Sequence, residues 1–109
     1  MGRDISWIMN PRSIAVIGAS SRKGSVGNDV FRNILNAEFQ GVVYPVNPRA
    51  QFINSVPCYP TLADIPGPED LGIIIVPARS VPQVIEESAA KGAKGLIIIS
   101  AGFKEVGGE

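Results

Sequence analysis

Four short runs of consecutive apolar residues constrain the fold of this chain more than any other feature of its sequence. They occupy residues 13–17, 41–46, 71–76 and 95–99, and they are rich in Val and Ile. None of them alternates apolar with polar residues, as a strand exposed on one face would. Strands that are buried on both faces have this pattern, and such strands are typical of parallel sheets enclosed by helices. The sequence therefore predicts an α/β fold with a parallel sheet, and Pro45 predicts that the second strand lies at its edge or ends early.

The segments between the first and second runs and between the third and fourth have the periodicity of amphipathic helices. The inner face of the first helix is predicted to carry Val26, Val30, Ile34 and Ala37, with Phe31 and Leu35 beside them. Asn28 is predicted on the solvated face, and Ser25 as the N-cap. The second helix follows Ser80, turns Val84, Ile85, Ser88 and Ala89 inward, and ends at Gly92. Each half of the chain is thus predicted to be a β-α-β unit.

The two halves are joined by residues 47–68, a connection that contains five prolines. Its apolar piece at residues 56–59 predicts a small extra strand. Residues 61–65 predict a single helical turn capped by Thr61.

The composition excludes most autonomous catalysis. The chain of 109 residues contains no histidine and a single cysteine, Cys58, so it lacks the parts for a Ser-His-Asp triad, a phosphohistidine or a zinc site. Its ten basic residues balance ten acidic ones, which argues against general nucleic-acid binding. No apolar run is long enough to span a membrane, and no signal peptide is apparent. We therefore expect one cytoplasmic domain, residues 1–109, with no catalytic residue, metal site, nucleic-acid partner or membrane partner.

Residues 101–109 are too short for the helix that should follow a fourth strand in this architecture. We therefore expect the chain to be a fragment of a larger protein, ending before the last helix of its domain.

A glycine-rich turn at residues 18–27 follows the first strand and leads into the first helix. Such a turn presents unpaired backbone N–H groups and the positive end of the helix dipole to an anion. Hydroxyl groups and cations add to it, so the predicted phosphate-binding residues are Gly18, Ser20, Ser21, Arg22, Lys23, Gly24 and Ser25. A tight βα turn with solvated polar residues is the less favoured interpretation.

The residues after the second strand narrow the choice of phosphate ligand. The turn matches neither the Walker pattern nor Gly-x-Gly-x-x-Gly, and the second strand ends in Asn47-Pro48-Arg49, where an NAD site has an acidic residue. Asn47 and Arg49 favour a phosphorylated ribose, as in NADP or coenzyme A (CoA). A plain turn at Asn47-Pro48 remains an alternative.

Five segments in order, residues 10–20, 24–27, 44–48, 76–78 and 100–105, together resemble the N-terminal CoA-binding domain of NDP-forming acyl-CoA synthetases. That family includes ADP-forming acetate–CoA ligases and is related to the alpha subunit of succinate–CoA ligase. The resemblance implies a Rossmann-like fold that binds CoA or acyl-CoA and works with phosphohistidine-bearing and ATP-grasp units.

The resemblance also implies a role for each loop. The turn from Ser20 to Ser25 would hold the CoA phosphates, and Asn47, Pro48 and Arg49 would lie near the ribose or its phosphate. The adenine and pantetheine path would be lined by Val76, Pro77, Ile99, Ser100 and Ala101. Two alternatives remain open: a CoA-sensing regulatory domain of a protein acetyltransferase, and the NADP-binding half of an oxidoreductase.

Overall fold

The computed structural model describes residues 11–99. Its elements are β1 (Ser13–Ile17), α2 (Val26–Asn36), β2 (Val42–Val46), β3 (Phe52–Ile53), β4 (Val56–Pro57), the 3-10 turn η1 (Leu62–Asp64), β5 (Leu71–Ile74), the 3-10 turn η2 (Ala78–Ser80), α3 (Val81–Ala90) and β6 (Gly95–Ile98). The four runs of apolar residues thus form the four longest strands, as predicted, and β1 has the predicted bounds.

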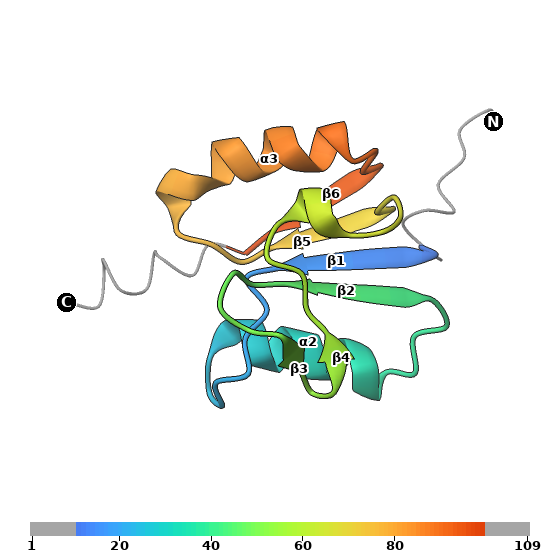
Figure 1. The fold of residues 1–109 in the computed structure, drawn as a ribbon, viewed down its shortest axis with the longest axis vertical. Helices are drawn as coiled ribbons and strands as arrows, with labels where there is room; N and C mark the ends of the chain where they lie inside the picture. The colour runs from blue at the N-terminus through green and yellow to red at the C-terminus, as the bar shows by residue number, and fades with distance from the viewer. Residues whose placement is uncertain (1–10, 100–109) are drawn as a thin grey trace.

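These four strands form one parallel sheet in the order β2-β1-β5-β6 (Figure 1). The chain moves outward from β1 to β2, then crosses to the other side of β1 to make β5 and β6. The strand order therefore reverses between β1 and β5. In open α/β sheets, ligands bind outside the carboxyl ends of the strands at such a reversal. The predicted α/β fold with flanking helices is confirmed.

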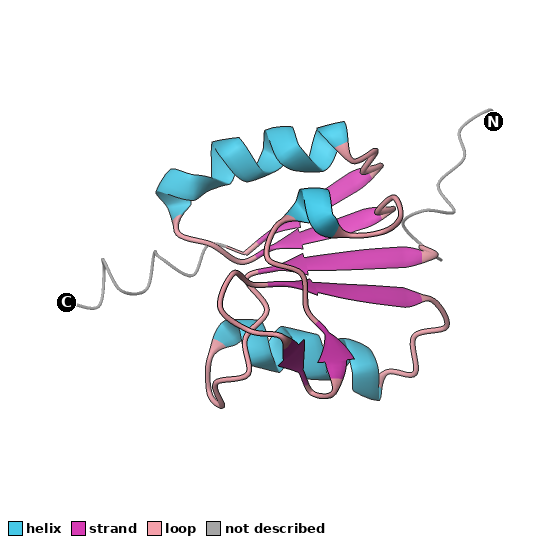
Figure 2. Ribbon diagram, viewed as in Figure 1, coloured by secondary structure: helices cyan, strands magenta, loops and turns pink. Residues whose placement is uncertain are grey.

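Helices cover the two faces of the sheet separately (Figure 2). One face packs against α2 and β3 through a core that contains Ile14, Val16, Phe31 and Ile53. The other face packs against α3 and η1 through a core that contains Ile17, Ile74, Leu62 and Val84. The sheet is the middle of three layers, between the two cores. The side of the sheet at which its parallel strands end is called the carboxyl edge below.

The prediction for the buried face of α2 is wrong in part. Val26 is 42% exposed, whereas Gly27 and Asn28 are buried; Phe31, predicted beside the inner face, is buried as expected. Asn28 is buried because its side-chain Nδ2 donates a hydrogen bond of 2.8 Å to the Ser20 carbonyl oxygen. Helical periodicity sorts residues by polarity and cannot detect such a partner eight residues away.

The prediction for α3 also needs correction. Val84 and Ser88 are buried, but Ala89 is exposed. Ser80 occupies the N-cap position without a side-chain hydrogen bond to the helix. Gly92 does end the helix, with φ of +88°, as its sequence position predicts.

The two outer strands of the sheet, β2 and β6, are more exposed than the two central strands. β2 is an edge strand, as Pro45 predicts, and Tyr59 runs beside it and donates its backbone N–H to the Pro45 carbonyl oxygen at 2.9 Å. β6 is the other edge of the described sheet, and its Ile97 and Ile98 are 48% and 47% exposed. Burial on both faces, which was predicted for all four runs, therefore holds for β1 and β5. It holds only for the last two residues of β2, and it does not hold for β6.

The proline-rich connection contains both of the small elements that were predicted. β3 and β4 form an antiparallel hairpin, and Thr61 starts the turn η1 with its backbone N–H and hydroxyl both bonded to the Asp64 carboxylate. Among residues 11–99, no helix is both long enough and apolar enough to cross a membrane.

Candidate functional site at the carboxyl edge of the sheet

Two glycines fix the turn between β1 and α2 against its neighbours. Gly18 has a φ of +102°, and a Cβ there would collide with the carbonyl oxygen of Ile75. A Cβ on Gly27 would collide in turn with the carbonyl oxygen of Gly18. Gly18 thus lets the chain pass close to β5, and Gly27 lets the first turn of α2 lie directly on the end of β1. The position of the turn follows from this close backbone packing.

Side-chain hydrogen bonds then hold the shape of the turn. The Ser25 Oγ caps α2 by accepting from the Asn28 backbone N–H at 3.1 Å, and it donates to the Arg22 carbonyl oxygen at 2.7 Å. The Ser20 Oγ accepts from the Arg22 backbone N–H at 3.0 Å. Ser25 confirms its predicted role as N-cap. Because the Ser25 hydroxyl proton is donated to the Arg22 carbonyl oxygen, the main role of Ser25 is to hold the shape of the turn.

The turn retains donors that face no protein acceptor. Within residues 11–99, no hydrogen bond accounts for the backbone N–H groups of Ser20, Ser21, Lys23 and Gly24. They lie just before α2, whose N-terminal end carries a partial positive charge. Unpaired N–H groups at a helix N-terminus form a site that suits phosphate.

The loop after β2 is attached to this turn. The Asn47 Nδ2 donates to the Ala19 carbonyl oxygen at 2.8 Å, and the Asn47 Oδ1 accepts from the Arg49 backbone N–H at 2.7 Å. Asn47 therefore joins the loop that carries Pro48 and Arg49 to the end of β1. The structure brings together these two groups of predicted residues, which lie almost thirty positions apart in the sequence.

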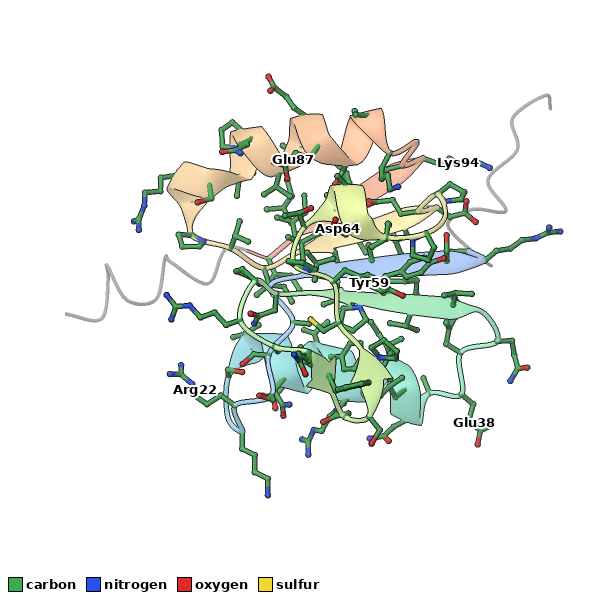
Figure 3. All side chains as sticks on the ribbon, in the orientation of Figure 1. Arg22, Glu38, Tyr59, Asp64, Glu87 and Lys94 are labelled. Carbon is green, nitrogen blue, oxygen red and sulfur yellow. The ribbon has the colours of Figure 1, made fainter. Side chains whose placement is uncertain are left out.

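Cations gather at this edge without acidic neighbours. Arg22, Lys23, Arg49 and Arg79 lie in or next to residues 18–25, 47–51 and 75–80, and these three segments contain no Asp or Glu. None of the four forms an ion pair within residues 11–99, whereas Arg32 pairs with Asp29 and Lys94 with Asp70. Figure 3 shows Arg22 at the carboxyl edge, far from Lys94 and Glu38 at the opposite edge. A chain of zero net charge thus has one positive edge.

The loops after β5 and β6 complete the edge. The Ile75 backbone N–H donates to the Ile17 carbonyl oxygen at 2.7 Å, which holds the end of β5 beside the phosphate turn. Val76 is half-buried against the core below α3, and Pro77 is exposed. The Ile99 backbone N–H donates to the Ile74 carbonyl oxygen at 2.9 Å. The predicted site residues Ser100 and Ala101 lie outside the described residues.

An open hollow of about 520 Å³ lies beside the loop after β2. Its walls include Pro48, Arg49, Phe52, Cys58 and Pro60. The volume is within the usual range for small-molecule sites, about 300–1,000 Å³. Of these residues, only Pro48 and Arg49 were singled out for binding from the sequence. Phe52 was missed, although an aromatic residue just beyond Arg49 is a signal that the sequence contains.

Cys58 shows none of the features of an activated thiol. Burial raises the pKa of its thiol, and this outweighs the lowering effect of backbone hydrogen bonds at Asn47 and Tyr59. Its Sγ lies 3.6 Å from the Asn47 carbonyl oxygen. A thiol with a raised pKa is a weak nucleophile at neutral pH.

Glu69 is a buried titratable residue in the loop before β5. Its side chain is fully buried against Gly72 of β5, and its carboxylate has no hydrogen-bond partner within residues 11–99. Burial raises its pKa to about 7, and Ser88 and Lys91 offset only part of this effect. Glu69 precedes β5, so it lies toward the amino ends of the strands and away from the phosphate turn.

Comparisons with known proteins find relatives that match most of the chain. A profile of the family described as CoA binding domain matches residues 12–106. The chain is 50% identical over 97 residues to an acetate–CoA ligase [ADP-forming] I of Archaeoglobus fulgidus, and the match covers 89% of this chain and 14% of that protein. It is 46% identical over 101 residues to a 4-hydroxybutyrate–CoA ligase [ADP-forming] of Nitrosopumilus maritimus, covering 93% of this chain and 14% of that protein.

A solved structure agrees with the sequence matches. The dinucleotide forming acetyl-coenzyme A synthetase 1 of Ca. Korarchaeum cryptofilum, in its apo form, superposes with a TM-score of 0.86 at 40% identity, covering 97% of this chain and 23% of that one. The chain therefore spans less than a quarter of the length of these three proteins.

Proposed function

Because the chain belongs to the CoA binding domain family, we propose that it binds coenzyme A at the carboxyl edge of its sheet, as the CoA-binding module of an ADP-forming acyl-CoA synthetase. The observation that carries this proposal is the turn at residues 18–25. It combines unpaired backbone N–H groups, a helix N-terminus and uncompensated cations on a chain whose net charge is zero. Coenzyme A is rich in phosphate, and this turn is the part of the chain best built to hold it.

The relatives support the choice of coenzyme A over the acid that is joined to it. By their names, one relative uses acetate and another 4-hydroxybutyrate, yet both are CoA ligases that form ADP. The segment that they share with this chain suits the component common to both reactions. The acid is therefore expected to be recognised by parts of the protein outside this segment.

Each loop has a separate role in the proposed site. The backbone N–H groups of Ser20, Ser21, Lys23 and Gly24 bind the diphosphate, and Arg22 and Lys23 neutralise its charge. Gly18 and Ser25 set the shape of the turn. Arg49, held by Asn47 and Pro48, faces the ribose phosphate.

The loops after β5 and β6 border the rest of the ligand in this proposal. Val76 and Pro77 follow β5, and Ile99 follows β6, at the edge where the strand order reverses. Together with Ser100 and Ala101, they are proposed to line the path of the pantetheine arm.

The structure offers a direct test of fit for coenzyme A. Gly18 and Gly27 let the backbone of the turn pack closely against its neighbours, and no acceptor within residues 11–99 occupies the N–H groups of Ser20, Ser21, Lys23 and Gly24. The cations at this edge are unpaired within the described segment 11–99. A ligand that carries several phosphate charges fits this set of N–H donors and cations, because charge-assisted hydrogen bonds to phosphate are stronger than those to a neutral group.

The full ligase reaction converts a carboxylic acid, CoA and ATP into acyl-CoA, ADP and phosphate. We propose that this chain contributes the CoA site as a single domain, residues 1–109, of a larger cytoplasmic ligase. It contains no histidine, so a phosphohistidine must come from another unit. An ATP-grasp unit is proposed to bind the nucleotide. The chain alone is predicted to bind CoA without converting it.

Calorimetric titration of the 109-residue chain with CoA and with NADP tests the proposal. CoA is expected to bind more tightly than NADP, and Arg22→Ala with Lys23→Ala is expected to weaken CoA binding at least tenfold. Arg32→Ala provides a matched control, because Arg32 lies on α2 and pairs with Asp29. Tighter binding of NADP, or equal CoA binding by the double variant, would contradict the proposal.

A further inference from the structure

Phe52 is exposed in a way that folding alone does not explain. Its side chain is 61% exposed, the largest value among the large apolar residues of the described segment 11–99. Leaving such a ring in water forgoes the favourable free energy of burying it. Phe52 also forms part of the wall of the hollow beside Arg49. A ligand in the hollow would cover the ring.

The segment that carries Phe52 is firmly held. Its neighbour Ile53 is fully buried in the core below α2, and Phe52 pairs with Pro57 in the β3–β4 hairpin. The Cys58 backbone N–H donates to the Gln51 carbonyl oxygen at 2.8 Å. An aromatic ring on a fixed base is pre-organised for contact, so a ligand need not order this segment when it binds.

The loop that forms one wall of the hollow is bonded to the start of the phosphate turn. Arg49 lies in its wall, and Asn47 attaches the Arg49 loop to Ala19 at the start of the turn. The Cys58 side chain, in the same wall, contacts the Asn47 carbonyl oxygen. The loop after β2 therefore connects three groups: the exposed ring of Phe52, the guanidinium of Arg49 and the phosphate turn at residues 18–25. A purine nucleoside that carries phosphates on its ribose offers groups in the same order.

From this arrangement we infer that the adenine ring of coenzyme A stacks on Phe52 in this hollow, with Arg49 facing the 3′-phosphate. The inference rests on the proposed function and adds Phe52 as a residue that contacts the adenine of the ligand. In this arrangement the purine lies beside β3, and Val76 and Pro77 contact the pantetheine arm. Stacking of a base on an aromatic side chain contributes enough affinity to measure by substitution.

Titrations with two fragments of coenzyme A test the inference. Adenosine 3′,5′-bisphosphate carries the base and the 3′-phosphate, whereas 4′-phosphopantetheine carries neither. Phe52→Ala is expected to weaken binding of CoA and of adenosine 3′,5′-bisphosphate about tenfold, with no change for 4′-phosphopantetheine. Phe52→Trp should keep wild-type affinity because the indole also stacks.

A matched control comes from the first residue of β2, in the four-stranded sheet. Val42 of β2 is 49% exposed and lies away from the hollow, so Val42→Ala should change neither affinity. Unchanged binding of CoA and of adenosine 3′,5′-bisphosphate by folded Phe52→Ala overturns the inference but leaves the proposed function intact. Failure of the wild-type chain to bind CoA overturns both.

A second measurement does not depend on the alanine variant. Phe52→Trp in a Trp7→Phe background has one indole, since Trp7 is the only native tryptophan. Adenosine 3′,5′-bisphosphate should quench its fluorescence, and 4′-phosphopantetheine should not. Equal responses to the two compounds, or no response to the bisphosphate at a concentration that saturates the chain, would count against stacking at this position.

Discussion

The side-chain amide of Asn47 donates a hydrogen bond of 2.8 Å to the backbone carbonyl of Ala19. This bond crosses from the end of β2 to the end of β1 and joins the Arg49 loop to the phosphate turn. The other side-chain atom, Oδ1, holds the Arg49 backbone at 2.7 Å. One residue thus positions both halves of the proposed nucleotide site. Asn47 acts through its neighbours as well as through any contact with ligand.

Asn47→Asp should break this link while keeping the acceptor for Arg49. A carboxylate cannot donate to the Ala19 carbonyl, and it adds a negative charge beside the phosphate turn. We expect the free energy of unfolding to fall by about 1–3 kcal/mol and CoA affinity to fall at least tenfold. Denaturant unfolding and calorimetry measure the two effects. Asn33→Asp on the exposed side of α2 adds the same charge and should alter neither strongly; a similar loss of affinity there would argue against a specific role for Asn47.

Ser25→Asp should keep the shape of the turn while adding a negative charge to it. Asp caps helices about as well as Ser, and a negative charge at a helix N-terminus is favourable. Loss of the hydroxyl bond to Arg22 costs about 1 kcal/mol, so we expect stability to change by no more than about that amount. CoA affinity should fall at least tenfold, because the carboxylate repels phosphate.

The neutral cap Ser25→Asn serves as the control for this charge effect. It should keep most of the affinity, and the loss caused by Ser25→Asp should shrink at high salt. Equal CoA affinity in wild type and Ser25→Asp would show that the phosphates bind elsewhere.

Buried Glu69 predicts how stability depends on pH. Its pKa rises from 4.5 to about 7 on folding, so the folded chain keeps a proton that the unfolded chain releases. Stability should therefore fall as pH rises from about 4.5 to about 7, by a total on the order of 3 kcal/mol, and change little through this group at higher pH. Lys91 and Ser88 are the groups that face it.

Thermal or denaturant unfolding across this pH range measures the effect. Glu69→Gln should remove most of the slope, and exposed Glu86→Gln should leave it in place. Identical slopes in wild type and Glu69→Gln would mean that the carboxyl is ionised in the folded chain.

Much of the fold is predictable from local patterns in the sequence. The four strands are continuous apolar runs, and Ser25 and Gly92 have the cap positions that they occupy in the structure. The features that escaped prediction depend on distant partners. Asn28 is buried because Ser20 accepts its amide, and Glu69 because β5 and α3 close over it.

The same division applies to the candidate site. The phosphate turn is visible in the sequence because its residues are contiguous. The hollow beside Phe52 is not, since it needs residues 48–52 and 58–60 to meet through the β3–β4 hairpin.

Backbone amide NMR of the 109-residue chain during titration with CoA tests most directly whether the carboxyl edge binds the ligand. The N–H signals of Ser20, Ser21, Lys23 and Gly24 are predicted to shift most, together with that of Arg49. The signals of Glu38 and Lys94, at the opposite edge (Figure 3), are predicted to stay in place. Shifts concentrated at that opposite edge, or no shifts in the turn at saturating CoA, would contradict the assignment.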